Sequence, residues 1–168
     1  LPQRYGHMNG VPNFEKDDKV KIYRFYTPEH KNKFLKQFIS YFFYSISTLK
    51  FAIKSRNEFD TIFATSSRLG TAFLGFLISK ITSLPLSLDI RDVFSDNVKS
   101  ISFFKTYFGK IFVKIFSMTE SLVLSHAKWL NFVSPGFNNY SHINVKRVNL
   151  FTNGIDNIFT KKKPFKKK

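Results

Sequence analysis

The sequence predicts an α/β domain built on a parallel sheet, and three observations support this prediction. Four short apolar runs have the composition of buried strands: "DTIFAT" (60–65), "LSLDI" (86–90), "WLNFV" (129–133) and "RVNLF" (147–151). Roughly a dozen to forty residues separate successive runs, too many for hairpins and enough for helical crossovers. Sequence with helical periodicity lies between the runs. This alternation is typical of βαβ units.

The segments between and before the runs predict the helices. Residues 69–82 and 102–126 place apolar side chains at spacings of three and four, as on one face of a helix. An aromatic-rich helix is predicted over 33–54, preceded by a strand in "KVKIYRFYTP" that ends before Pro28. We therefore divide the chain into a loop-like segment (1–18), an α/β domain (19–156) and a basic tail or linker (157–168).

Composition limits the function classes. The 168 residues are 43% apolar and 18% aromatic, enough for a substantial core. No uncharged apolar run reaches the ~20 residues of a membrane-spanning helix. The chain has no cysteine and only four scattered histidines, so neither a disulfide nor a metal centre is expected, and a reducing cytoplasm is the default location.

The net charge of +16 predicts attraction to polyanions, either nucleic acid or an anionic membrane surface. Genome composition is an equally open explanation of the positive charge, because an AT-rich genome also produces abundant Lys, Asn, Ile and Phe. Part of the charge lies in the terminal "KKKPFKKK", which has the composition of a solvated tail.

Polar loops follow each predicted strand. If the strands are parallel, these loops share the sheet edge where open α/β sheets bind ligands. They are "SSRLG" (66–70), "RDVFSDN" (91–97), "SPG" (134–136) and "TNGID" (152–156). Hydroxyls, amides, Gly and Asp suit a polar ligand such as a sugar or a phosphate.

The second of these loops belongs to an acidic cluster in an otherwise basic chain: Asp89, Asp92 and Asp96 surround Arg91. Arg91 could keep one carboxylate ionised while another accepts a hydrogen bond from a substrate hydroxyl. Asp92 or Asp96 could instead cap the next helix.

The other loops also allow two interpretations. Ser66, Ser67 and Arg68 could bind an anion at a helix N-terminus, or a serine there could be a simple cap. Asn153 and Gly154 indicate a turn followed by a possible cap at Asp156. His126 ends a predicted helix, where positive charge is favourable.

"IFATSSRLGTAFLG", "LSLDIRDVFSDN", "FVSPGF" and "NLFTNGID" together resemble, in this order and spacing, the N-terminal domain of family 4 glycosyltransferases of the GT-B fold. The likeness is to bacterial members that build O-antigen and capsule, such as fucosamine transferases, and covers roughly residues 9–159. "RDVFS" resembles the family's Arg-Asp-Leu-Trp-Pro segment with Phe94 and Ser95 in place of Trp and Pro, and "GVPNF" resembles a Phe-Pro-Asn loop.

The resemblance implies a Rossmann-like parallel sheet with helices on both faces, the N-terminal half of a GT-B fold. The family's first strand and its C-terminal donor-binding domain have no counterpart in this sequence. It implies transfer of a sugar from a nucleotide-sugar co-substrate to a lipid-linked sugar acceptor, with no metal or other cofactor. We therefore expect a chain that needs a donor domain for activity and lies at the inner face of the bacterial membrane.

The resemblance also assigns roles to residues. Asp92 and Arg91 would be catalytic, and acceptor contacts would come from Asp89, Asp96, Ser66, Ser67, Arg68 and Asn13. Asn153, Gly154 and Asp156 would form the turn toward the donor side.

Two alternative functions remain open. A non-enzymatic basic module would bind anionic membrane or nucleic acid with a steep salt dependence. The aromatics lie at core spacing on helices, so no specific nucleic-acid partner is expected. A metal-dependent phosphatase or nuclease built on the acidic cluster would bind magnesium through Asp92.

Overall fold

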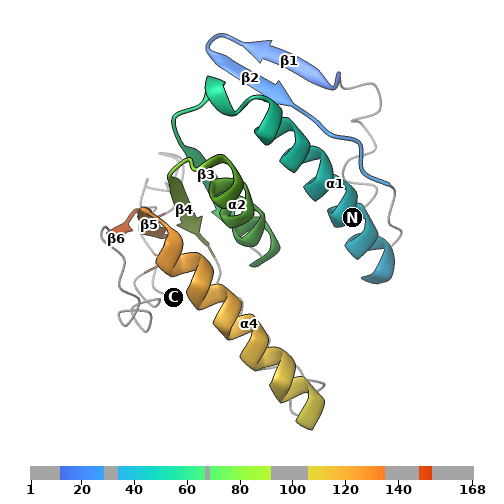
Figure 1. Ribbon diagram of the computed structural model, residues 1–168, viewed down its shortest axis with the longest axis vertical. Coiled ribbons are helices and arrows are strands. Elements are labelled where there is room, and N and C mark those ends of the chain that lie inside the picture. The colour runs from blue at the N-terminus through green and yellow to red at the C-terminus, as the bar shows by residue number, and fades with distance from the viewer. Residues whose placement is uncertain (1–11, 29–33, 67–68, 92–105, 135–147, 153–168) are drawn as a thin grey trace, which may run out of the picture. The chain divides into compact units, whose positions relative to one another are not determined.

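The computed structural model describes residues 12–28, 34–66, 69–91, 106–134 and 148–152 (Figure 1). The chain divides into two compact units, Leu1–Phe59 and Asp60–Lys168. This boundary differs from the one drawn from the sequence at residue 19. In the described part of the chain, no helix is both long enough and apolar enough to cross a bilayer.

The first unit contains a hairpin and a long helix. Strands β1 (Phe14–Asp17) and β2 (Val20–Tyr23) pair antiparallel, and α1 spans Phe34–Lys54 before a short 3-10 turn, η2 (Arg56–Glu58). The loop-like assignment of 1–18 is therefore wrong for residues 14–17. The two-residue loop that closes the hairpin is unusual because Asp18 adopts a positive φ of 47° without being glycine. The predicted strand before Pro28 and the predicted helix are both present.

The second unit is a Rossmann-like α/β fold with a four-stranded parallel sheet in the order β3-β4-β5-β6. Its strands are β3 (Ile62–Ser66), β4 (Leu86–Ile90), β5 (Trp129–Phe132) and β6 (Val148–Leu150). Helix α2 (Leu69–Thr82) joins the first two strands, and α4 (Tyr107–His126) precedes β5. All four predicted strands are present and run in one direction, as expected.

Helix α4 begins five residues later than the sequence predicted. Thr106 has extended backbone, and its side chain accepts a hydrogen bond from the Gly109 N–H at 3.1 Å. A threonine in this position is an N-cap that satisfies one of the free N–H groups of the first turn. Apolar periodicity continues upstream of the cap, so periodicity alone did not reveal the start.

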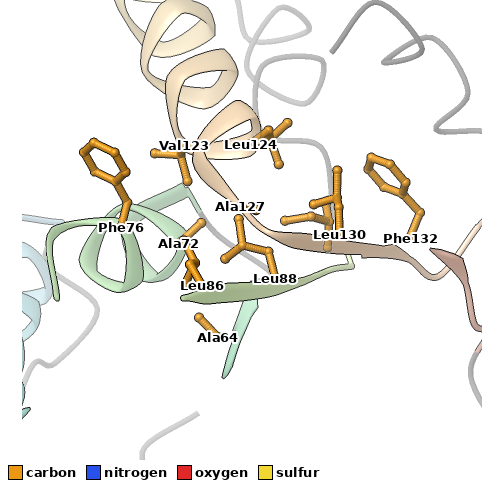
Figure 2. Close-up of a cluster of buried hydrophobic side chains, with 11 residues drawn as sticks. Ala64, Ala72, Phe76, Leu86, Leu88, Val123, Leu124, Ala127, Leu130 and Phe132 are labelled. Carbon is orange, nitrogen blue, oxygen red and sulfur yellow. The ribbon is translucent and has the colours of Figure 1, made fainter. Parts of the chain in front are cut away.

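The core lies between the sheet and the helices α2 and α4 (Figure 2). Its central members are the fully buried Leu86, Leu88 and Leu130 of the strands and Val123 of α4. Alternate strand residues point to opposite faces, so these leucines define the helix-covered face of the sheet.

Helix α2 approaches the sheet very closely at Gly75. A Cβ atom added there would lie 3.0 Å from Cβ of Ala64 and 3.3 Å from Cδ1 of Leu86. Glycine therefore sets the spacing between this helix and strands β3 and β4.

Candidate functional site

The polar residues of the sheet form a row on the face opposite the core. Asp89 alternates with the buried Leu88 and Ile90 on β4, and Asn131 alternates with core residues on β5. Pairing places Thr65, Asp89, Asn131 and Asn149 in one register across the four strands. The row lies near the carboxyl ends of the strands, where ligands of open α/β sheets bind.

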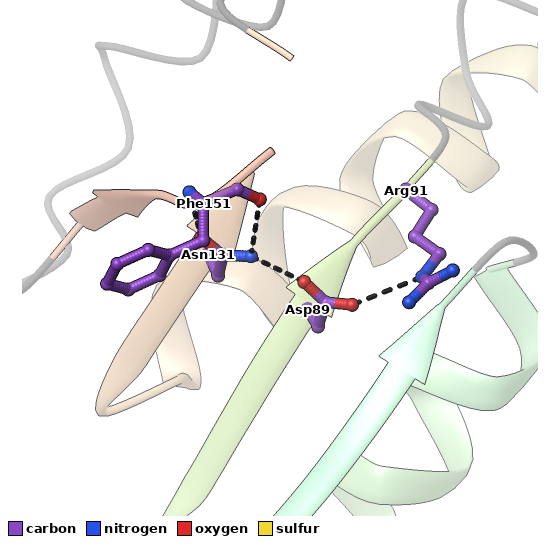
Figure 3. Close-up of polar contacts among 4 residues, drawn as sticks. All are labelled: Asp89, Arg91, Asn131 and Phe151. Carbon is purple, nitrogen blue, oxygen red and sulfur yellow. Dashed lines mark hydrogen bonds and ion pairs between the residues drawn. The ribbon is translucent and has the colours of Figure 1, made fainter. Parts of the chain in front are cut away.

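Asp89 is the centre of this row (Figure 3). Its side chain is only 10% exposed, and both carboxylate oxygens accept hydrogen bonds. Arg91 donates Nε–H to Oδ2 at 3.2 Å, and Asn131 donates Nδ2–H to Oδ1 at 2.5 Å. The cation and the amide together compensate the cost of burying the carboxylate.

Asn131 connects Asp89 to the chain after the last strand. Its Oδ1 accepts the Phe151 N–H at 2.8 Å, and its Nδ2 lies 3.4 Å from the Phe151 carbonyl. The Asn131 side chain thereby makes hydrogen bonds to the backbone of Phe151, directly after β6, in place of a neighbouring strand. One amide thus fixes the carboxyl ends of three neighbouring strands relative to one another.

Of the described pair Asp89 and Arg91, Arg91 is the exposed member. Its side chain is 52% exposed, and among the described residues its guanidinium has a single partner, Asp89, reached through Nε. As far as the described residues go, both terminal Nη groups keep hydrogens that could be donated to an anion or to hydroxyls. A guanidinium whose Nε is bound to a carboxylate can still bind a phosphate through its Nη groups with two parallel hydrogen bonds.

Both carboxylate oxygens of Asp89 are engaged by donors within the protein. The sequence placed it among the acceptor-binding residues, yet the structure directs each of its oxygens to a protein donor. Asp89 does lie beside Arg91, as the sequence predicted.

The other predicted residues are placed as follows. Ser66 ends β3 in register with Ile90, at the same sheet edge as Arg91, and its side chain is not described. Asn13 belongs to the first unit, where its carbonyl accepts the Arg24 N–H at 2.8 Å. The remaining predicted site residues lie outside the described residues: Ser67, Arg68, Asp92, Asp96, Asn153, Gly154 and Asp156.

Asn131 was not identified from the sequence, although a signal for it exists. "LSLDI" and "WLNFV" each carry one polar residue inside an apolar run. Aligning the runs as parallel neighbours puts Asp89 beside Asn131. Polar residues that interrupt adjacent buried strands at matching positions indicate a shared contact.

A serine and a histidine form a second polar contact, between α2 and α4. Ser79 Oγ lies 3.0 Å from Nε2 of His126 and donates its only hydrogen to the Leu84 carbonyl at 2.6 Å. Nε2 of the histidine must therefore be the donor to the serine oxygen. In this arrangement the histidine does not act as a base toward Ser79, and the contact joins the helix ends.

The surroundings of His126 disfavour the positive charge that would be favourable at the end of its helix. Burial lowers the pKa of His126, and the positive charge of Lys80 lowers the pKa further. The ring of Phe76 meets the imidazole edge-on with 5.0 Å between ring centres. These neighbours favour the neutral imidazole.

Two findings complete the description of the site. Within the described ranges, no three His, Cys, Asp or Glu side chains come together as metal ligands. Comparison with protein-family models and with curated protein sequences gave no match to this chain.

Proposed function

We propose that the chain is the acceptor-side domain of a GT-B glycosyltransferase that extends a lipid-linked glycan in the synthesis of bacterial surface polysaccharide. The observation that carries this proposal is the Arg91 guanidinium, held through Nε by buried Asp89 at the carboxyl edge of the parallel sheet. The parallel sheet with this polar edge also agrees with the sequence resemblance.

A lipid-linked sugar acceptor presents a diphosphate and several hydroxyls, and the guanidinium offers donors for both. In the proposed reaction an acceptor hydroxyl oxygen bonds to the anomeric carbon of the donor sugar. The bond from that carbon to the nucleotide diphosphate breaks, and the hydroxyl proton passes to a carboxylate. We assign this carboxylate to Asp92, the residue that follows Arg91.

Arg91 and Asp89 contribute orientation to this reaction. Holding an acceptor in a reactive geometry can supply roughly 7–11 kcal/mol of barrier reduction at best. The nucleotide sugar would be bound by a donor domain facing this edge. The proposed location is the cytoplasmic face of the membrane, where a lipid-linked acceptor is accessible.

Calorimetric titration of the full chain with a farnesyl diphosphate-linked sugar tests the proposal. The free sugar and inorganic diphosphate are titrated separately for comparison. Arg91→Gln should weaken binding of the linked sugar at least about tenfold, because a charge-assisted hydrogen bond contributes about 1.5–3 kcal/mol. Lys128→Gln is the matched control, since Lys128 is an exposed cation that immediately precedes β5, at the opposite edge of the same sheet.

Two results would contradict the proposal. In one, the two variants weaken binding equally. In the other, duplex DNA competes with the linked sugar at Arg91, as the alternative of a general polyanion-binding module predicts.

A further inference from the structure

Helix α1 carries an apolar surface that its own unit leaves uncovered. Six large side chains recur at spacings of three and four along one side of the helix. We call them the α1 stripe: Leu35, Phe38, Ile39, Phe42, Phe43 and Ile46, with Ile53 continuing it two turns later. Leu35 is 69% exposed, Phe38 63% and Phe42 54%. From Leu35 to Ile53 the stripe is about 27 Å long at 1.5 Å per residue.

The opposite side of α1 is attached to the hairpin unit. The ring centre of Phe51 lies 4.5 Å from that of Tyr23 and 5.8 Å from that of Phe25. Ser40 is buried and donates its hydroxyl to the Pro28 carbonyl at 2.9 Å. Ser40 and Phe51 both lie about 140–160° around the helix from Leu35, so these contacts hold the face away from the stripe.

The charge on α1 identifies what can cover the stripe. The helix contains Lys36, Lys50 and Lys54 and no acidic residue, and all three lysines are exposed. Helical spacing puts them on one flank of the stripe, about 60–100° from Leu35. An exposed apolar stripe with lysines along one flank, on a helix without acidic residues, is the pattern of a helix that lies in an anionic membrane interface.

A second copy of the chain fits this surface less well. Two α1 stripes packed together would bring lysines of both helices into the same interface with no carboxylate on either helix to pair with them. Phosphate headgroups, by contrast, pair with the lysines while the acyl region accepts the Phe, Leu and Ile side chains.

We infer that α1 docks on an anionic lipid bilayer in the plane of the interface, with the α1 stripe inserted and Lys36, Lys50 and Lys54 on headgroup phosphates. This inference names the surface that would hold the chain at the membrane, and its functional purpose rests on the proposed function. Docking there would concentrate the chain where a lipid-linked acceptor lies.

Vesicle flotation of the full chain tests the inference. One set of vesicles contains equal parts of phosphatidylglycerol and phosphatidylcholine, and the other contains phosphatidylcholine alone, both without acceptor lipid. The wild type should float with the anionic vesicles and remain unbound with the neutral ones. Lys50→Gln should weaken anionic binding about fivefold, as expected for one basic residue near an anionic surface. Phe42→Asp should weaken it more than about tenfold.

Met118→Asp is the matched control, because Met118 is a 64% exposed apolar residue on a helix of the other unit. It should leave flotation unchanged, and circular dichroism of every variant should match the wild type. Equal loss in Phe42→Asp and Met118→Asp would overturn the inference. So would a soluble dimer that Phe42→Asp dissociates, in a chain that binds neither kind of vesicle.

Because the vesicles contain no acceptor, the assay is independent of the Arg91 titration. A chain that floats but shows no Arg91-dependent ligand binding would refute the proposed acceptor site and support the docking surface. The reverse result would refute the docking surface alone.

Discussion

The side-chain amide of Asn131 donates a 2.5 Å hydrogen bond to Oδ1 of Asp89, linking two parallel strands on one face of the sheet. The other carboxylate oxygen holds Arg91 at the sheet edge. The two contacts differ in the exposure of the partner of Asp89, since Asn131 is half-buried whereas Arg91 is exposed. The amide contact should therefore contribute more to stability and the guanidinium contact more to ligand binding.

A double-mutant cycle separates these contributions. We predict a coupling free energy of about 1–3 kcal/mol between Asp89→Ala and Asn131→Ala, because either variant removes a hydrogen bond made by the buried Asp89 carboxylate. The coupling between Asp89→Ala and Arg91→Ala should be smaller, below about 1 kcal/mol, because solvent screens a half-exposed pair. Urea denaturation of the single and double variants measures both values, and a larger coupling for the arginine pair would reverse the assignment.

Acid should destabilise the second unit through His126. Because the folded-state pKa of His126 lies below its unfolded value of about 6.5, folding favours the neutral imidazole, and this stability is present above that pH. It is lost as the pH falls from about 6.5 through the lowered folded-state pKa.

The measurement is the free energy of unfolding at pH 8 and at pH 5 for wild type and His126→Gln. Glutamine can still donate to Ser79 but does not titrate, so the variant should lose less stability on acidification. An identical loss in the two proteins would show that His126 does not contribute to the pH dependence.

Side chains larger than hydrogen at position 75 should destabilise the fold. Gly75→Val would add a branched side chain where the Cβ atom alone already lies 3.0 Å from Cβ of Ala64 and 3.3 Å from Cδ1 of Leu86, and overpacking of this kind costs about 1–3 kcal/mol. Gly75→Ala should fall between wild type and the valine variant, because improved helix propensity partly offsets the contact with Ala64. Thermal denaturation provides the ranking, and a valine variant as stable as wild type would show that α2 can move away from the sheet.

A glycine directly after α2 should stabilise the chain. Ser83 has a φ of 61°, a left-handed conformation that costs a residue with a side chain roughly 1–2 kcal/mol. We predict that Ser83→Gly raises the free energy of unfolding by up to about 1 kcal/mol, whereas the β-branched Ser83→Val lowers it. Both effects are read from urea denaturation midpoints, and similar midpoints for Gly and Val would contradict the prediction.

The sequence predicted most of the second unit, because its strands and helices are separated by clear changes of periodicity. Helix α2 has the predicted bounds, Leu69–Thr82, and β4 the predicted bounds, Leu86–Ile90. The hairpin was not predicted. Its β1 segment, "FEKD", is short, exposed and mostly charged, and its turn uses Asp18 in place of glycine, so neither strand composition nor a glycine turn marks it.

The site was predicted only in part. Three aspartates close to one arginine in the sequence pointed to Asp89 and Arg91, which the structure brings together. Asn131 lies 42 residues from Asp89 and becomes a neighbour only when the strands are aligned in register. The partner of each Asp89 oxygen likewise depends on tertiary contacts, which the order of residues in the chain does not reveal.

The most direct test of the central claim is a nuclear magnetic resonance titration of the labelled chain with the farnesyl diphosphate-linked sugar, following backbone amides at both sheet edges. We predict shifts at Ile90, Arg91 and Val133, which lie at the carboxyl ends of β4 and β5, and the loss of these shifts in Arg91→Gln. Thr61 and Lys128, at the amino ends of β3 and β5, should not respond. Shifts confined to the amino edge, or shifts at the carboxyl edge that persist without Arg91, would contradict the assignment of the acceptor site.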